Sequence, residues 1–230
     1  MKILKICALL FILIFSSSGI IYLPSVSAGE GVSENDVIAS IEKRYKNITG
    51  LQSEFSQQNY IAALDQYRHF QGELFLLRPH LFAMEIVFPS QQNLVFDGQF
   101  FWIYTSANNQ ALKHTVAPDF LDNPLINLLT NIADLRENFF LSLAESDSAS
   151  DYRLSLTFKD PEVDIRKIHL AVAKKDFQIK GMTLYYASGN HTEIAFTGIR
   201  ENPDISCERF QFIPPPGTEI VEKITPLTQP

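Results

Sequence analysis

Apolar and polar residues alternate along much of the chain, most densely between Gly72 and Tyr104. In that segment 19 of 33 residues are apolar and eight are aromatic. Pro79, Pro89 and the pair Asp97-Gly98 interrupt the alternation. Period-two alternation predicts strands, whereas Pro and Asp-Gly predict the turns between them. We therefore expect three or four strands here, one of which presents Phe82, Met84, Ile86 and Phe88 on a single face.

The same pattern predicts strands on either side of this segment. They cover residues 51–60, 67–77, 111–116, 152–159, 168–172, 179–186 and 192–199. Phe210 and Phe212 also alternate, just before a run of three prolines. The chain is thus predicted to contain nine to eleven strands joined mostly by short turns.

Two segments show helical rather than strand periodicity. Residues 33–49 begin with a capping Ser33 and end before Gly50. A second helix is predicted from Asn123-Pro124, and a short helical piece is predicted over residues 133–143. The apolar stripes of the two main helices comprise Val37, Ile38, Ile41, Tyr45 and Ile48, and Leu125, Leu128, Leu129 and Ile132.

The order of these elements predicts the fold class. Long strand–helix alternation is missing, which argues against a parallel sheet. A large antiparallel sheet curls, and the apolar helix stripes must be buried somewhere. We therefore predict a mainly β fold: a curled antiparallel sheet with helices over its concave side.

The N-terminus has the pattern of a secretory signal peptide. Lys2 and Lys5 precede ten apolar residues, 6–15, and Val26-Ser27-Ala28 fits a cleavage site. An uncleaved anchor is the alternative, but the apolar run is short of the roughly 18 residues that a spanning helix needs. The predicted organisation is a signal peptide at 1–28, one domain at 29–222 and a flexible tail at 223–230, with export to the periplasm.

Charge and cysteine content narrow the functional classes. Removal of Lys2 and Lys5 reduces the 19 basic residues to 17, against 26 acidic residues, for a net charge of −9. This balance argues against a nucleic-acid partner. The mature chain would retain only Cys207, so its folding would depend on an apolar core rather than on a disulfide.

No pattern in the sequence assembles a catalytic or cofactor site. Phosphate-binding glycine loops, nucleophile elbows and CxxC pairs are missing, and we predict neither an enzyme nor a cofactor. Asp97 fits a turn, and Cys207 without basic neighbours fits a structural thiol. The five His residues are His69, His80, His114, His169 and His191, and their spacing is not that of a metal-binding motif. A metal site would have to be built from His residues that are distant in the sequence.

The order of several short motifs resembles the family of LolA, the periplasmic carrier of outer-membrane lipoproteins. These motifs are Gly72 to Phe82 with Arg78-Pro79, Leu94 to Gly98, and Trp102 to Tyr104. The Phe55-x-Gln57 strand, the helix at 124–129 and the ending at 210–220 are also similar. The resemblance covers about residues 32–222.

The resemblance implies an unclosed β-barrel of eleven antiparallel strands with a helical lid over a hydrophobic cavity. Acyl chains of lipoproteins would occupy the cavity, and Arg78 would bond lid backbone groups in the closed state. A LolCDE-type inner-membrane transporter would load the carrier, a LolB-type receptor would unload it, and the carrier would act as a monomer. The predicted cavity residues are Leu74, Leu76, Phe82, Met84, Ile86, Phe88 and Trp102. The predicted lid residues are Val37, Ile41, Tyr45, Leu125, Leu128 and Leu129.

Other interpretations of these residues exist. The apolar face from Phe82 to Phe88 also fits an ordinary filled β core, and Arg78 also fits a surface ion pair. A LolA-like lipid-binding sensor module of the envelope is the second functional class, and a secreted hydrolase is the third.

Overall fold

The computed structural model describes residues 32–115, 128, 132, 135–159 and 164–223. Strands dominate this part of the chain, as predicted, and the predicted signal peptide lies outside it. The strands are β1 (Gly50–Ile61), β2 (Gln66–Leu77), β3 (Leu81–Phe88), β4 (Gln92–Phe96), β5 (Phe100–Thr105), β6 (Gln110–Thr115), β7 (Phe139–Ala144), β8 (Asp151–Phe158), β9 (Ile165–Ala173), β10 (Ile179–Tyr186), β11 (His191–Glu201) and β12 (Glu219–Lys223). The helices are α1 (Glu34–Tyr45), α3 (Leu135–Asn138) and the 3₁₀ turns η1 (Ala62–Leu64), η2 (Ser106–Asn108) and η5 (Cys207–Phe210).

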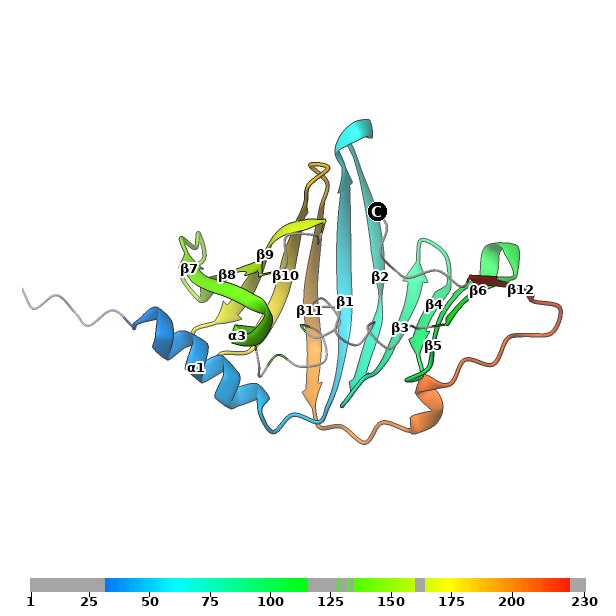
Figure 1. Cartoon of the computed structure of the whole chain (residues 1–230), viewed down its shortest axis with the longest axis horizontal. Coiled ribbons are helices and arrows are strands. Elements are labelled where there is room, and N and C mark those ends of the chain that lie inside the picture. Colours follow the sequence, from blue (N-terminus) through cyan, green and yellow to red (C-terminus); the bar gives the residue numbers. More distant parts are fainter. Residues whose placement is uncertain (1–31, 116–127, 129–131, 133–134, 160–163, 224–230) are drawn as a thin grey trace, which may run out of the picture. The chain divides into compact units, whose positions relative to one another are not determined.

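The twelve strands of the described residues belong to one unclosed sheet, in the order β12-β6-β5-β4-β3-β2-β1-β11-β10-β9-β8-β7 (Figure 1). The predicted mainly β, unclosed sheet is confirmed, but two details of the prediction were wrong. The sheet has twelve strands, and β12 pairs with β6 in the parallel direction. Lys223, expected in a frayed tail, is registered opposite His114 in that pair.

The predicted helix at 133–143 was also wrong in its second half. The helix α3 ends at Asn138, and the chain then forms the edge strand β7 against β8. Pairing with β8 supplies the backbone hydrogen bonds that decide the strand, so tertiary context overrides the local propensity. Phe210, expected in a strand, lies in η5.

Helix α1 begins as the sequence predicts and ends earlier. The Ser33 side chain accepts a hydrogen bond from the Asp36 amide, and Glu34 and Asp36 lie in the positive first turn. The last helical residue is Tyr45, five residues before Gly50, which instead opens β1. Because α1 ends at Tyr45, the residues between Tyr45 and Gly50 can turn the chain from the helix into the sheet.

The apolar stripe of α1 packs on one face of the sheet, which we call the inner face. Val37, Ile38 and Ile41 are at most 1% exposed. They share one core with inner-face residues of β7–β10, including Leu154, Leu170 and Met182. The strand register shows that these residues lie on the same face, because residues directly opposite each other on neighbouring strands point to the same side of a sheet.

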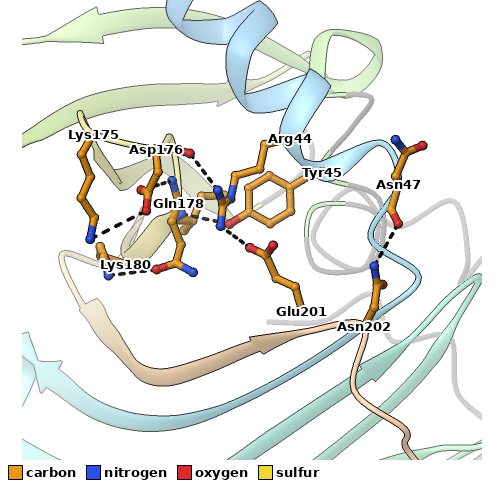
Figure 2. A network of polar contacts seen from close by, with 10 residues as sticks. Arg44, Tyr45, Asn47, Lys175, Asp176, Gln178, Lys180, Glu201 and Asn202 are labelled. Carbon is orange, nitrogen blue, oxygen red and sulfur yellow. Dashed lines mark hydrogen bonds and ion pairs between the residues drawn. The ribbon is translucent and has the colours of Figure 1, made fainter.

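The C-terminal end of α1 is attached to the sheet by polar contacts (Figure 2). The Arg44 guanidinium donates to the Asp176 carbonyl at 2.9 Å and pairs with the Glu201 carboxylate at 2.5 Å. The Tyr45 hydroxyl accepts the Ile179 amide at 2.9 Å. Because Ile179 starts β10, these bonds hold the end of the helix over the β9–β10 connection.

Tyr45→Phe is expected to lower the free energy of unfolding by about 1–3 kcal/mol, because the Ile179 amide would remain buried without an acceptor. Burial raises the pKa of the Tyr45 hydroxyl above its ordinary value. The folded state therefore retains this proton better than the unfolded state. The contribution of the protonated Tyr45 hydroxyl to the free energy of unfolding is fully present below about pH 10, and it is lost as the pH rises through the pKa of the folded state.

Urea unfolding of both proteins across pH 7–11 checks this expectation. The stability advantage of the wild type over Tyr45→Phe should shrink above about pH 10. An advantage that stays constant with pH would contradict the assigned burial of the hydroxyl.

Candidate functional site

A second apolar cluster lies on the same face of the sheet, beside the core that α1 fills. Phe55, Leu74, Leu76 and Ile86 are its buried members, each at most 8% exposed. Leu51, Phe70, Phe82, Met84, Leu94, Ile194 and Phe196 pack against them. We call these eleven residues the inner surface.

The inner surface and the α1 core are parts of one continuous sheet face. Met182 of the core is registered opposite Ile194, and Phe196 is registered opposite Phe55. Leu51, Ile194 and Phe196 contact both clusters. The two parts differ in how they are filled. Described helical residues pack on the core, whereas every described residue of the inner surface belongs to a strand.

Five of the seven predicted cavity residues lie together on the inner surface. Leu74 faces Met84, Leu76 faces Phe82, and Ile86 lies one step further along β3. Phe82 and Met84 are half-buried, so part of each side chain remains accessible. The structure therefore brings together most of the residues that alternate along β2 and β3.

Phe88 does not join the inner surface. A bulge between β2 and β3 places Phe88 opposite Gln71, while Ile86 is opposite Gly72. Gln71 points to the other face, so the one-residue shift carries Phe88 to that face, where it is 51% exposed. Gly72 permits the bulge, because a Cβ at this position would collide with the Glu85 carbonyl oxygen.

Trp102 was also predicted for the cavity, and the structure places it on the opposite, outer face. Trp102, Val95, Ala83 and Phe75 are registered in one row across four strands. This row forms a separate core beneath Phe210 and Phe212, and the Trp102 and Phe212 rings lie 5.3 Å apart. The C-terminal segment thus occupies the surface that Trp102 helps to form.

Polar contacts fasten the C-terminal segment to this outer face. The Arg209 guanidinium lies over the Phe75 ring at 4.5 Å and pairs with Glu85 at 2.5 Å. The β2–β5 region therefore carries an apolar cluster on each face. Two apolar faces explain why its sequence is so rich in apolar residues.

The predicted lid residues fall into two groups. Val37, Ile41 and Tyr45 of α1, together with Leu128, are buried in the core over β7–β10. Leu125 and Leu129 lie outside the described residues. The described α1 residues therefore fill the part of the inner face next to the inner surface rather than the inner surface itself.

Arg78 lies where the two parts of the inner face meet. Its backbone amide donates to the Thr49 carbonyl at 2.8 Å, which fixes its position beside the start of β1. A small cleft joins Arg78 to Tyr45 of α1, Leu76 of the inner surface and Ile132. Arg78 is thus placed between α1, the inner surface and Ile132.

The polar residues considered as reactive groups have structural surroundings. Asp97 accepts hydrogen bonds from the amides of Gln99 and Phe100, as a turn residue does. Cys207, predicted as a structural thiol, is exposed. Across the described ranges, no group of three or more metal-binding side chains comes close enough to hold an ion, and no helix is long and apolar enough to cross a membrane.

A polar hollow lies over β8–β11, and Ile194 is the one inner-surface residue in its lining. It has a volume of about 630 Å³ and is lined largely by polar residues of β8–β11 and of the loop before β8, including Ser56, Asp147, Arg153, His169, Lys180 and Glu193. Partial burial, with the nearby charges of Lys167 and Arg153, lowers the pKa of His169. The lowered pKa favours the neutral form of His169.

Comparison with known proteins decides the family. Residues 46–213 match the family described as outer membrane lipoprotein carrier protein LolA. The chain belongs to the LolA family. An outer-membrane lipoprotein carrier protein of Azotobacter vinelandii is 27% identical over 75% of this chain and 82% of its own length. One of Ralstonia nicotianae is 25% identical over 90% of this chain and 95% of its own length.

A solved structure of another protein shares the fold of this chain. An uncharacterized conserved protein of Thermus thermophilus superimposes with a TM-score of 0.50 and 12% identity, over 82% of this chain and 98% of that chain. At this level of identity the likeness concerns the fold alone.

The sequence missed several residues of the inner surface in this LolA-family chain. Leu94, Ile194 and Phe196 contribute to it from β4 and β11. Their alternation was visible, and Phe55 was noted within the family resemblance. Only the strand register shows that all of them share a face with Leu74.

Proposed function

We propose that this chain is a periplasmic chaperone that carries lipoproteins. It accepts lipoproteins released from the inner membrane, shields their acyl chains on the inner surface and delivers them to an outer-membrane receptor. The inner surface carries this proposal, because it is a continuous apolar face lined by described strand residues alone, beside a core that α1 already fills. The matched family and the named relatives support lipoprotein as the cargo.

The energetics of acyl chains favour a carrier with a closable site. Burial contributes about 0.8 kcal/mol per CH₂, so a lipid anchor with several chains cannot cross water unprotected. Noncovalent affinity saturates near roughly −20 kcal/mol, and the cargo must also be released. Opening a lid would expose apolar residues, and that cost would reduce the net affinity to a level that permits release.

The proposed partners follow from this cycle. A LolCDE-type transporter of the inner membrane would load the carrier, and a LolB-type receptor would unload it. Because the periplasm supplies no ATP, the cargo would pass to the receptor down a gradient of affinity. We propose that the carrier works as a monomer and that its mature N-terminus is Gly29, after cleavage behind Ala28.

Mass spectrometry of the protein purified from the periplasm tests the function most directly. Native spectra should contain a complex with triacylated protein, and the mass of the free chain should correspond to a start at Gly29. The control is a carrier with Val87→Glu, an exposed position that should retain the complex. A wild-type protein that never carries acylated protein, with lipoproteins sorted normally after its depletion, would contradict the proposal.

Arg78→Leu is expected to impair the hand-over of cargo while leaving the protein folded. The family resemblance gives Arg78 charge-assisted hydrogen bonds to the lid, and such bonds contribute about 1.5–3 kcal/mol each. Their loss would favour the open state and tighten cargo binding by about tenfold or more. Transfer of labelled lipoprotein to receptor-containing membranes measures the effect, and unchanged transfer would favour a surface ion pair for Arg78.

A further inference from the structure

Ser53 is a polar residue within an apolar surface. It lies on β1 between Leu51 and Phe55, and alternation places all three side chains on the inner face. On the neighbouring strand it is registered opposite Leu74, a member of the inner surface. Ser53 is 1% exposed, and with His114 it is one of the two buried polar residues of the described chain.

The Ser53 hydroxyl has no hydrogen-bond partner in the structure. Buried polar groups are nearly always paired, since an unpaired hydroxyl loses its bonds to water without replacement. The Tyr45 hydroxyl on the same face shows the usual situation, because it accepts the Ile179 amide. Ser53 therefore carries a cost that its surroundings within the chain do not offset.

The sheet is irregular at this position. On β11 the register passes from Arg200, opposite Gln52, to Thr197, opposite Glu54, so no residue is registered opposite Ser53. Gly198, with φ of +59°, provides the left-handed conformation that the bulge requires. The bulge sets Gly198 and Ile199 together against Ser53 in place of one paired residue, and on the other side Ser53 is registered opposite the apolar Leu74.

We propose that the Ser53 hydroxyl donates a hydrogen bond to an ester carbonyl oxygen of the cargo's acyl chains. This inference rests on the proposed function, because it takes the inner surface as the acyl-binding site. The chains themselves are hydrocarbon, and the esters that join two of them to the glyceryl group carry carbonyl acceptors that accompany them into an apolar site. Ser53 would thus make the surface selective for acylated anchors over plain alkyl chains.

Two lipopeptide probes of equal chain length test this selectivity. Both carry two chains on a glyceryl-cysteine with a free amino group, one through ester bonds and the other through ether bonds. Ser53→Ala is expected to weaken binding of the ester probe by about threefold to tenfold, as loss of one hydrogen bond does, and to leave the ether probe unchanged. Ser56→Ala is the matched control, because it removes a hydroxyl from the exposed side of the same strand.

The stability of the ligand-free protein provides a second test, because Ser53→Ala should raise stability while it weakens binding of the ester probe. Ser53→Ala removes an unpaired hydroxyl from an apolar site, so the melting temperature of the ligand-free protein should rise. A serine with a purely structural role would instead lose stability on substitution. The carbonyl stretch of a ¹³C-labelled ester probe should also lie at lower wavenumber on the wild type than on Ser53→Ala.

The outcomes distinguish a wrong role for Ser53 from a wrong assignment of the acyl-binding site. Equal losses for ester and ether probes, or no loss for either, would overturn the role of Ser53 while the carrier function stands. A lower melting temperature for Ser53→Ala with unchanged affinity would assign Ser53 to the fold. Failure of the wild type to bind either probe would remove the acyl-binding site, and the role of Ser53 with it.

Discussion

Phe82→Glu is expected to abolish productive carriage of lipoproteins. Phe82 is half-buried on β3 opposite Leu76, and it packs against the buried centre of the inner surface. Loss of the aromatic contact costs about 1.5–3 kcal/mol, and desolvation of a carboxylate against an acyl chain costs several kcal/mol more. Affinity for an acylated probe should therefore fall by at least about a hundredfold.

Fluorescence titration with an acylated lipopeptide, and transfer of labelled lipoprotein between membranes, measure this loss. Val87→Glu is the control, because Val87 lies on the same strand and is 68% exposed. If Phe82→Glu does not fold, as judged by circular dichroism, Phe82→Ala gives a milder test of the same contact. Wild-type affinity and transfer in a folded Phe82 variant would show that acyl chains bind elsewhere.

Leu170→Ala is expected to cause the largest loss of stability, about 2–5 kcal/mol. Leu170 is fully buried on β9, between Leu154 of β8 and Met182 of β10, in the core that α1 covers. Truncation removes buried methyl groups and leaves a cavity that strands on both sides cannot close. Because the same core holds α1 beside the inner surface, carriage should become heat-sensitive before it is lost.

Urea unfolding gives the change in free energy, and the midpoint should move with little change in slope. Val87→Ala, on an exposed side chain, should stay within about 0.5 kcal/mol of the wild type. A loss below about 1 kcal/mol for Leu170→Ala would mean that this core repacks easily. The packing of α1 would then not depend on it.

The sequence predicted the kind of fold well and the two faces of the sheet only in part. The cap at Ser33 and the strand-rich organisation are local features, and the structure confirms both. The family resemblance implied the unclosed sheet, and its antiparallel strands followed from the missing strand–helix alternation. The twelfth strand did not, because Glu219–Lys223 gains its hydrogen bonds only by pairing with β6, which is distant in the sequence.

The assignment of Trp102 shows why a pattern alone misplaces residues in this region. Along β2–β5 both faces are apolar, one as the inner surface and the other beneath Phe210 and Phe212. When both faces are apolar, alternation separates the side chains into two sets but does not say which set faces the helix. The bulge opposite Gly72 adds a second ambiguity, because it moves Phe88 from one set to the other.

The sequence by itself determined the family, the strand-rich organisation, the start of α1 and the concentration of apolar residues between Gly72 and Tyr104. These depend on composition, local spacing and motif order, which are properties of neighbouring residues. Only the tertiary structure decided that Leu74, Phe82 and Phe196 form one surface. It also showed that Ser53 lies unpaired within that surface, because strand register and burial arise from contacts between distant segments.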